Sequence, residues 1–414
     1  MSAPPLVVRG TRSAATASTW WLRALACAAV ALAPVEGYLT AVHGQLAKLA
    51  PALLIVSYVV VRVRQRRVPL VHPLHLVLAA LTALLLVSAA AHTQAPFAWE
   101  YTQRWLPFLV LTALLVDLAA REVTVRALMG AYVCGAVVAG AGALYSLVVE
   151  GSPRATGPLQ DPNDLAFVLA VALPLLIALR PGRGARGAPV ALLVGAAVVL
   201  LAGMAATFSR GGGLALLAAG TWLLARRALP PRAVAVAFTG LAALVAAAVA
   251  TGGQVLARAL QEKSFIAASN VDTREIRWRA ALRMLAENPV LGVGPGGFRS
   301  GYAAFSHNAE IAEQTPVAHN MFIEVAAELG LPAFALFAGM AAVALVAAER
   351  VLRAGADRAP MLAVQAGLIA TAVASCFLSE QYYLPLWLLV ALAAAADLRV
   401  RRRKVLGAGS SRDQ

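Results

Sequence analysis

The residues best suited to chemistry stand together near the end of the chain. His319 and Asn320 open a long apolar segment, and Glu324 and Glu328 follow within it. Residues four apart share a helical face, so Asn320 and the two carboxylates would lie along one side of a helix. An imidazole with its ordinary pKa of about 6.5 is suited to accept a proton at neutral pH. A histidine at a helix start is more often a cap or an interface residue, so this pattern alone leaves both roles open.

A second such group, SRGGG at 209–213, separates two apolar runs. Arg210 would cost roughly 2.5–3.5 kcal/mol at the centre of a membrane helix, which favours a place near water or an anion. Glycines let a backbone approach a ligand, and a helix that starts here directs its positive end to the same point. Ser209 and Arg210 therefore suit an anion site, although an arginine that only extends to the membrane surface gives the same pattern.

Two more stretches start helices in the same way, GPLQDPND at 157–164 and VAHNMFIE at 317–324. Asp161 followed by Pro162 is an ordinary helix cap, and Asn163 comes directly after it. The topology deduced below places all three helix starts on one face of the membrane. Three positive helix ends on one face, with arginines nearby, favour a shared anion site.

A polar segment between these stretches contains DTREIRWRAALRMLAEN at 272–288, which reads as a helix followed by Pro289. Arg274 shares a face with Trp278, Ala281, Leu282 and Leu285. This face either lies on lipid headgroups or turns Arg274 into the protein. The glycine-rich LGVGPGGF at 291–298 then predicts a turn that folds the segment back, with Phe298 as an apolar anchor.

Composition defines the class of protein. The chain has 414 residues, of which 60% are hydrophobic and 13% charged, and its formal net charge is +15. A soluble chain carries about 25% charged residues, so repeated long apolar runs indicate an all-α polytopic membrane protein. The three cysteines fall in apolar runs, and no histidines or cysteines show a metal-ligand spacing, so we expect neither metal nor cofactor.

Charge sets the predicted topology. We count about twelve apolar segments, and Lys and Arg gather in every second loop and in the tail RVRRRK at 399–404. The positive-inside rule then places both termini in the cytoplasm. An anionic inner leaflet accounts for the basic tail without any nucleic acid partner. The predicted organisation is residues 1–250 with spans 1–9, an extracytoplasmic helical loop cap at 251–318, spans 10–12 at 319–398, and a cytoplasmic tail at 399–414.

The set of motifs resembles the O-antigen ligase family of bacterial inner-membrane proteins. The matching features are SRGG, an Arg-x3-Trp helix with Arg274 and Trp278, NPVLGVGPGGF, and His319-Asn320 followed by Glu324, Glu328 and Gly330. The upstream GPLQDPND is similar to a motif of that family too. Each motif is short, and their order, spacing and common side make the set specific.

The resemblance implies a GT-C-like glycosyltransferase that needs no metal and works on the extracytoplasmic side. It would move a glycan from an undecaprenyl diphosphate carrier to a hydroxyl of a glycan, lipid or protein acceptor. Arg210 and Arg274 would hold the diphosphate, and His319 would accept the proton of the acceptor. Asn163, Ser209, Asn320 and Glu324 would position these groups.

Other readings of the sequence stay open. Within the family, a polysaccharide repeat polymerase or a protein O-oligosaccharyltransferase would carry the same motifs. A twelve-span transporter would show two related halves with charges at the membrane midplane, whereas the unusual residues here gather on one face. A catalytically silent scaffold would leave His319 unexplained.

Overall fold

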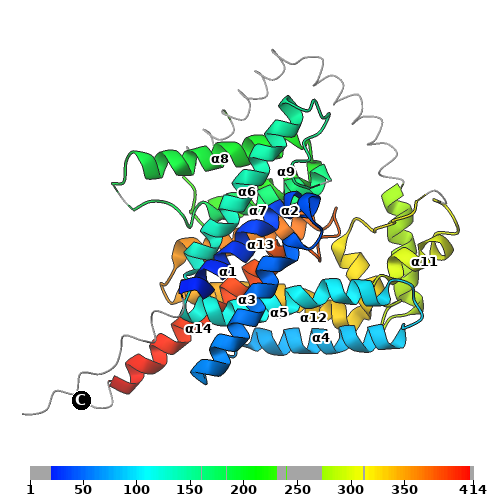
Figure 1. The fold of residues 1–414 in the computed structure, drawn as a ribbon, viewed down its shortest axis with the longest axis horizontal. Helices are drawn as coiled ribbons and strands as arrows, with labels where there is room; N and C mark the ends of the chain where they lie inside the picture. Colours follow the sequence, from blue (N-terminus) through cyan, green and yellow to red (C-terminus); the bar gives the residue numbers. More distant parts are fainter. Residues whose placement is uncertain are drawn as a thin grey trace, which may run out of the picture.

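The computed structural model describes residues 20–159, 161–182, 184–230, 239, 273–310 and 313–410. Every regular element within these residues is a helix, so the all-α prediction is confirmed (Figure 1). Before the polar segment the helices are α1 (Trp20–Leu32), η1 (Ala33–Val35), α2 (Glu36–Val42), α3 (Leu46–Gln65), α4 (Pro73–Ala91), α5 (Ala98–Arg121), α6 (Val125–Val148), α7 (Pro162–Leu175), α8 (Ala188–Ala206) and α9 (Arg210–Ala225). After a helix at 273–287 come α11 (Gly297–Phe305), α12 (Met321–Arg353), α13 (Arg358–Ala374) and α14 (Leu384–Ser410).

Seven of the described helical segments are long and apolar enough to cross a membrane, as expected of a polytopic membrane protein. They are Trp20–Val42, α3, α4, α5, α6, α8 and α12, and the shorter α7 and α13 are apolar as well. α9 has 16 residues, fewer than the roughly 20 that a span needs. The last part of the predicted spans 1–9, from residue 231 to 250, and the first part of the predicted cap, from 251 to 272, lie outside the described residues, Thr239 excepted. The count of twelve spans therefore stays a prediction.

The bundle is held together by its C-terminal helices. α14 packs against α5 and α12, while α13 packs against α7 and α9. An aromatic cluster joins α5, α12 and α14. The ring of Trp105 in α5 lies edge-on to Phe337 in α12 at 5.6 Å and to Trp387 in α14 at 5.9 Å. Such edge-to-face pairs stabilise a buried contact beyond the area that they bury. They fix α12, the helix that follows His319, against the rest of the bundle.

The glycine-rich turn lies against a break in α12. Gly330 has φ +79°, and the backbone on either side of it bonds to residues 289–294. The amides of Val293 and Gly294 donate to the carbonyls of Ala327 (2.9 Å) and Glu328 (2.9 Å), and Leu331 donates to Pro289 (2.8 Å). These bonds satisfy backbone groups that the break would otherwise leave free. The turn therefore does fold the polar segment back onto α12, and Phe298 is buried as predicted.

We expect Gly330→Ala to destabilise the protein strongly. A Cβ at this position would lie 2.2 Å from the Val290 carbonyl oxygen, in a backbone conformation that alanine disfavours. The two effects together are worth about 2 kcal/mol or more, which thermal unfolding in detergent would detect as a lower melting temperature. Gly339→Ala on the same helix is the matched control, because no neighbouring heavy atom lies within 4 Å of its added Cβ. Equal shifts for the two variants would contradict the proposed role of the break.

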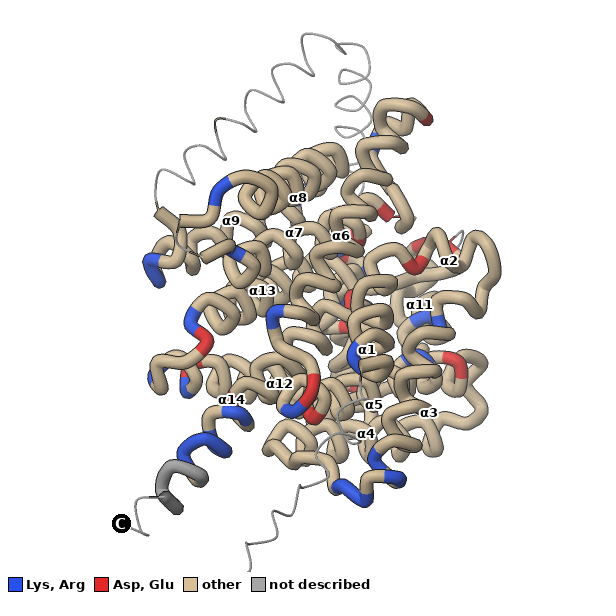
Figure 2. Tube along the Cα trace, turned by 60° about the vertical axis from the view of Figure 1, so that its left-hand side comes forward, with Lys and Arg blue, Asp and Glu red and all other residues tan. Residues whose placement is uncertain are grey.

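α11 and the C-terminal end of α14 lie at opposite ends of the molecule (Figure 1). Lys and Arg residues lie along the C-terminal part of α14, where the predicted basic tail is found (Figure 2). This separation of a basic end from the end that carries α11 agrees with the predicted orientation, which stays a prediction.

Candidate active site

Three of the helix starts picked out in the sequence are capped by polar side chains, as predicted for Asp161. Asp161 caps α7 through the Asn163 amide (2.7 Å), and Ser209 caps α9 through the Gly212 amide (3.3 Å). Asn320 caps α12 and accepts from the amides of Phe322 (3.1 Å) and Ile323 (3.2 Å). Each cap side chain satisfies a free amide of the first turn, and each helix directs a positive end outward.

His319 sits in a strained turn directly before α12. Its φ of +50° is unusual for a residue other than glycine, and such conformations persist only where the surroundings enforce them. Glu324 provides one such constraint, because its Oε2 accepts from the amide of Ala318 (2.8 Å) and from the hydroxyl of Ser379 (2.6 Å). Its Oε1 accepts from Gln381 Nε2 (2.7 Å), and the side chain is only 3% exposed. Glu324 thereby ties the turn to the segment between α13 and α14.

The helix at 273–287 holds the same turn from the other side. Trp278 Nε1 donates to the carbonyl of Ala318 (3.0 Å), and Arg277 Nη1 donates to that of Val317 (3.3 Å). Arg277 is 5% exposed and pairs with Glu310 and Glu313, each at 2.9 Å. The peptide groups on both sides of Ala318 are thus bonded, and this fixes the backbone that carries the imidazole.

The predicted orientation of this helix is partly wrong. Leu282, expected on the face with Arg274, is 52% exposed. The buried face instead runs through Arg277, Ala280, Ala281 and Met284. The reason is that the Arg277 guanidinium is buried among carboxylates and a carbonyl oxygen, which a count of apolar positions does not register.

Arg274 lies half-buried beside this turn. Burial lowers its pKa, the carboxylate of Asp161 opposes that shift, and the charge of Arg277 adds to it. None of the described residues forms an ion pair or hydrogen bond with the Arg274 guanidinium. A half-buried cation of this kind, near a second cation, is suited to an anionic ligand.

The same charges act on His319. Burial lowers its pKa most, the guanidinium groups of Arg277 and Arg274 add to this, and the carboxylates of Asp161 and Glu313 oppose it, so that the pKa lies at about 4. The imidazole is therefore neutral at pH 7 and keeps a free lone pair. The charges of Arg274 and Asp161 both act on His319, so the three residues lie close together although they come from separate segments of the chain.

The starts of α7 and α9 are joined by an arginine that sequence reasoning left without a role. Arg154 donates from Nη2 to Asn163 Oδ1 (3.1 Å) and from Nε to the carbonyl of Thr207 (3.0 Å). Asn163 also donates to its own cap, Asp161 (2.9 Å). Asn163 and Ser209 thus hold two helix starts in place, and none of their hydrogen bonds within the described structure reaches His319.

Arg210 is exposed at the first position of α9, at the same end of the bundle. A Cβ on Gly212 would lie 2.7 Å from Cβ of Ala166, so only glycine allows α9 to approach α7 this closely. Gly211 faces Phe377, and the carbonyl of the next residue, Leu378, accepts from the amide of Met321 (2.8 Å). The starts of α9 and α12 therefore adjoin one short segment after α13. No direct contact joins Arg210 to His319 or Arg274 in the described structure.

In the part of the chain that the structure describes, no three His, Cys, Asp or Glu side chains are grouped as metal ligands. What the arrangement offers is a neutral imidazole, a half-buried guanidinium and several positive helix ends. It suits chemistry on an anionic group beside a hydroxyl.

Fold and site together define a multi-pass helical membrane protein with a cationic site where several helices begin. Residues 195–338 match the family model described as O-antigen ligase, and this match supports the resemblance that the motifs indicated. The matched segment runs from α8 into α12 and contains Arg210, Arg274, His319 and Glu324, whereas Asn163 lies outside it. No curated protein matches the chain. The family implies ligase-like or polymerase-like transfer of glycans in the bacterial inner membrane.

Proposed function

We propose that the protein transfers a glycan from an undecaprenyl diphosphate carrier to an acceptor hydroxyl on the extracytoplasmic face. The observation that supports this most is the grouping of His319 with Arg274 and Asp161 at a turn held by Glu324, Arg277 and Trp278. A diphosphate needs cationic donors, and an attacking hydroxyl needs a base beside them.

The proposed step is a direct displacement. The acceptor oxygen forms a bond to the anomeric carbon while the bond from that carbon to the diphosphate oxygen breaks. The electron pair of the broken bond leaves with the diphosphate, where Arg210 and Arg274 stabilise the growing negative charge. The proton of the acceptor hydroxyl goes to His319, and the anomeric centre is inverted.

The depressed pKa of His319 has a role in this scheme. With the site free of substrate, burial and the charges of Arg277 and Arg274 keep the imidazole unprotonated. A bound diphosphate offsets the positive charge of Arg274, which raises the pKa of His319. The base then becomes stronger only when the donor is in place.

A deletion strain tests the proposed reaction and separates its two forms. A ligase leaves complete polymers on the carrier lipid when it is lost, whereas a polymerase leaves single repeat units. Mass spectrometry of extracted lipid-linked glycans would show which of these accumulates, and a plasmid copy should reverse the change. Lipid-linked and surface glycans that are unchanged by deletion would contradict the proposal.

A further inference from the structure

A cluster of charged side chains lies behind the turn that carries His319. At its centre, Arg277 binds Glu310 bidentately, with Nε donating to Oε2 (3.0 Å) and Nη2 donating to Oε1 (2.9 Å). Nη2 also donates to Glu313 Oε2 (2.9 Å), and Nη1 donates to the carbonyl of Val317 (3.3 Å). All three nitrogens of the buried guanidinium therefore have an acceptor within the protein.

Tyr302 joins this cluster from α11. Its hydroxyl donates to Glu310 Oε2, and its ring centre lies 6.0 Å from the guanidinium carbon of Arg277. Burial alone would raise the pKa of Glu310, but the hydrogen bonds from Arg277 and Tyr302 and the charge of Arg277 lower it on balance. Glu310 is thus ionised at neutral pH and is held by two buried side chains.

Arg274 and Arg277 stand one helical turn apart and differ in what they face. Arg274 is half-buried, and no described residue forms an ion pair with it. The donors of Arg277 are taken by two carboxylates and a carbonyl oxygen. A ligand that drew Arg277 away would leave those buried carboxylates without their cation, which is strongly unfavourable. A diphosphate is therefore expected to bind Arg274 and to leave Arg277 in place.

Arg277 also affects the base directly. Burial lowers the pKa of the His319 imidazole most, and among the neighbouring charges that of Arg277 has the largest effect. Arg274 adds to it, whereas Asp161 and Glu313 oppose it. The position of the Arg277 guanidinium, and the carboxylates that hold it, therefore influence both the backbone and the basicity of His319.

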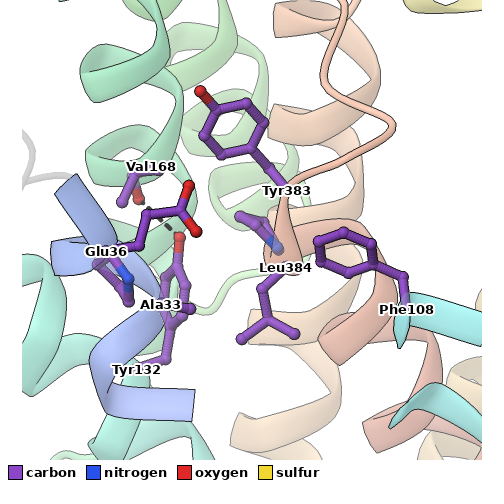
Figure 3. A pocket seen from close by; sticks show the side chains of 9 residues that line it. Ala33, Glu36, Phe108, Tyr132, Val168, Tyr383 and Leu384 are labelled. Carbon is purple, nitrogen blue, oxygen red and sulfur yellow. Dashed lines mark hydrogen bonds between the residues drawn. The ribbon is translucent and has the colours of Figure 1, made fainter. Parts of the chain in front are cut away.

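Glu310 is a further carboxylate of this charge balance, since it and His319 attract each other. Glu36 belongs to another part of the bundle. It lines a small cavity with Tyr132 and Tyr383, which has room for only a few water molecules (Figure 3). The carboxyl group of Glu36 acts on Tyr383 beside it, whereas the charges that act on His319 come from the residues around its own turn.

We propose that Glu310 and Glu313 are positioning residues, which hold Arg277 against the His319 turn and keep it from binding the diphosphate. The two arginines of this helix then have separate tasks. Arg274 binds the substrate, and Arg277 fixes the backbone that carries the base. Glu310 contributes more than Glu313, because it accepts two of the three bonds from Arg277 to carboxylates. The assignment rests on the proposed function and adds to it the residues that position its base.

The affinity of undecaprenyl diphosphate for the full-length protein in lipid nanodiscs tests the division of tasks. Arg277→Lys should bind the lipid as tightly as the wild-type protein, and Glu310→Gln should bind it at least as tightly. Glu275→Gln is the matched control, because Glu275 is exposed and pairs with Arg279 four residues away. A loss of affinity in Arg277→Lys or Glu310→Gln as large as that in Arg274→Lys would overturn the proposal.

The kinetics of transfer give a second test. We expect Glu310→Gln to lower kcat by about 10- to 100-fold and to leave the KM for the donor unchanged, because a misplaced base slows the chemical step without weakening the clamp. Glu313→Gln should lose less, since Glu313 accepts a single bond from Arg277. An unchanged kcat in folded Glu310→Gln, or a loss confined to KM, would overturn the proposal.

The pKa of His319 tests the cluster without any substrate, so it separates a failure of this proposal from a failure of the proposed reaction. It would be measured by NMR with carbon-13 at histidine Cε1, and the His319 signal would be assigned by its loss in His319→Asn. Arg277→Gln removes a positive charge and should raise this pKa above about 4, whereas Glu310→Gln removes a negative charge and should not raise it. A cluster that only supported the fold would expose the imidazole when disrupted and raise its pKa in both variants. A raised pKa in Glu310→Gln would therefore overturn the proposal.

Discussion

Replacement of His319 by asparagine is expected to lower the rate of glycan transfer by about 10²- to 10⁴-fold, the usual contribution of a general base. Asparagine cannot accept the proton of the acceptor hydroxyl, but it tolerates the left-handed backbone that this turn requires. The measurement is transfer by purified protein in nanodiscs, with the melting temperature recorded alongside. His319→Ala should be as inactive, and transfer at the wild-type rate by either folded variant would remove the base assignment.

The pH profile gives an independent check on the same residue. Because the pKa of His319 is lowered to about 4, the base is lost only as the pH falls through that value. The ratio kcat/KM, which reports the free protein, should therefore stay level from neutral pH down to about pH 5. An acid limb at the ordinary imidazole pKa of about 6.5 would contradict the electrostatic role given to Arg274 and Arg277.

The second large effect is expected from Arg274→Lys. A lysine keeps the charge but cannot form paired hydrogen bonds with a phosphate group, so we expect transfer to fall by roughly 10- to 100-fold. Donor titration at fixed acceptor would show the loss as weaker donor binding, slower transfer or both. Arg279→Lys is the control on the same helix, because Arg279 is exposed and pairs with Glu275 four residues away. Equal losses in both variants would mean that the effect does not come from a clamp on the diphosphate.

Helices and their starts were predictable from the sequence because they follow local rules. The Asp161 cap and the glycine-rich turn at 291–298 depend on neighbouring residues and on apolar periodicity.

Contacts between distant segments were not predictable in this way. Arg277, in the helix at 273–287, donates to the carbonyl of Val317. Arg154 donates both to Asn163 in α7 and to the carbonyl of Thr207. The carboxyl groups of Glu36 and Asp164 act on that of Glu380, although the three residues are far apart in the chain. Local periodicity contains no information on such pairs. From the sequence alone, a single arginine is predicted to be exposed at the surface. The one available signal was the cost of charged residues inside apolar segments, which marks them as functional or paired.

The central claim is that Arg210 and Arg274 hold the diphosphate of a carrier lipid beside His319. The most direct measurement is the affinity of undecaprenyl diphosphate for the purified protein in nanodiscs. The account predicts that Arg210→Lys and Arg274→Lys each weaken binding by roughly tenfold or more, while Arg279→Lys and His319→Asn retain it. Unchanged affinity in both arginine variants would contradict it.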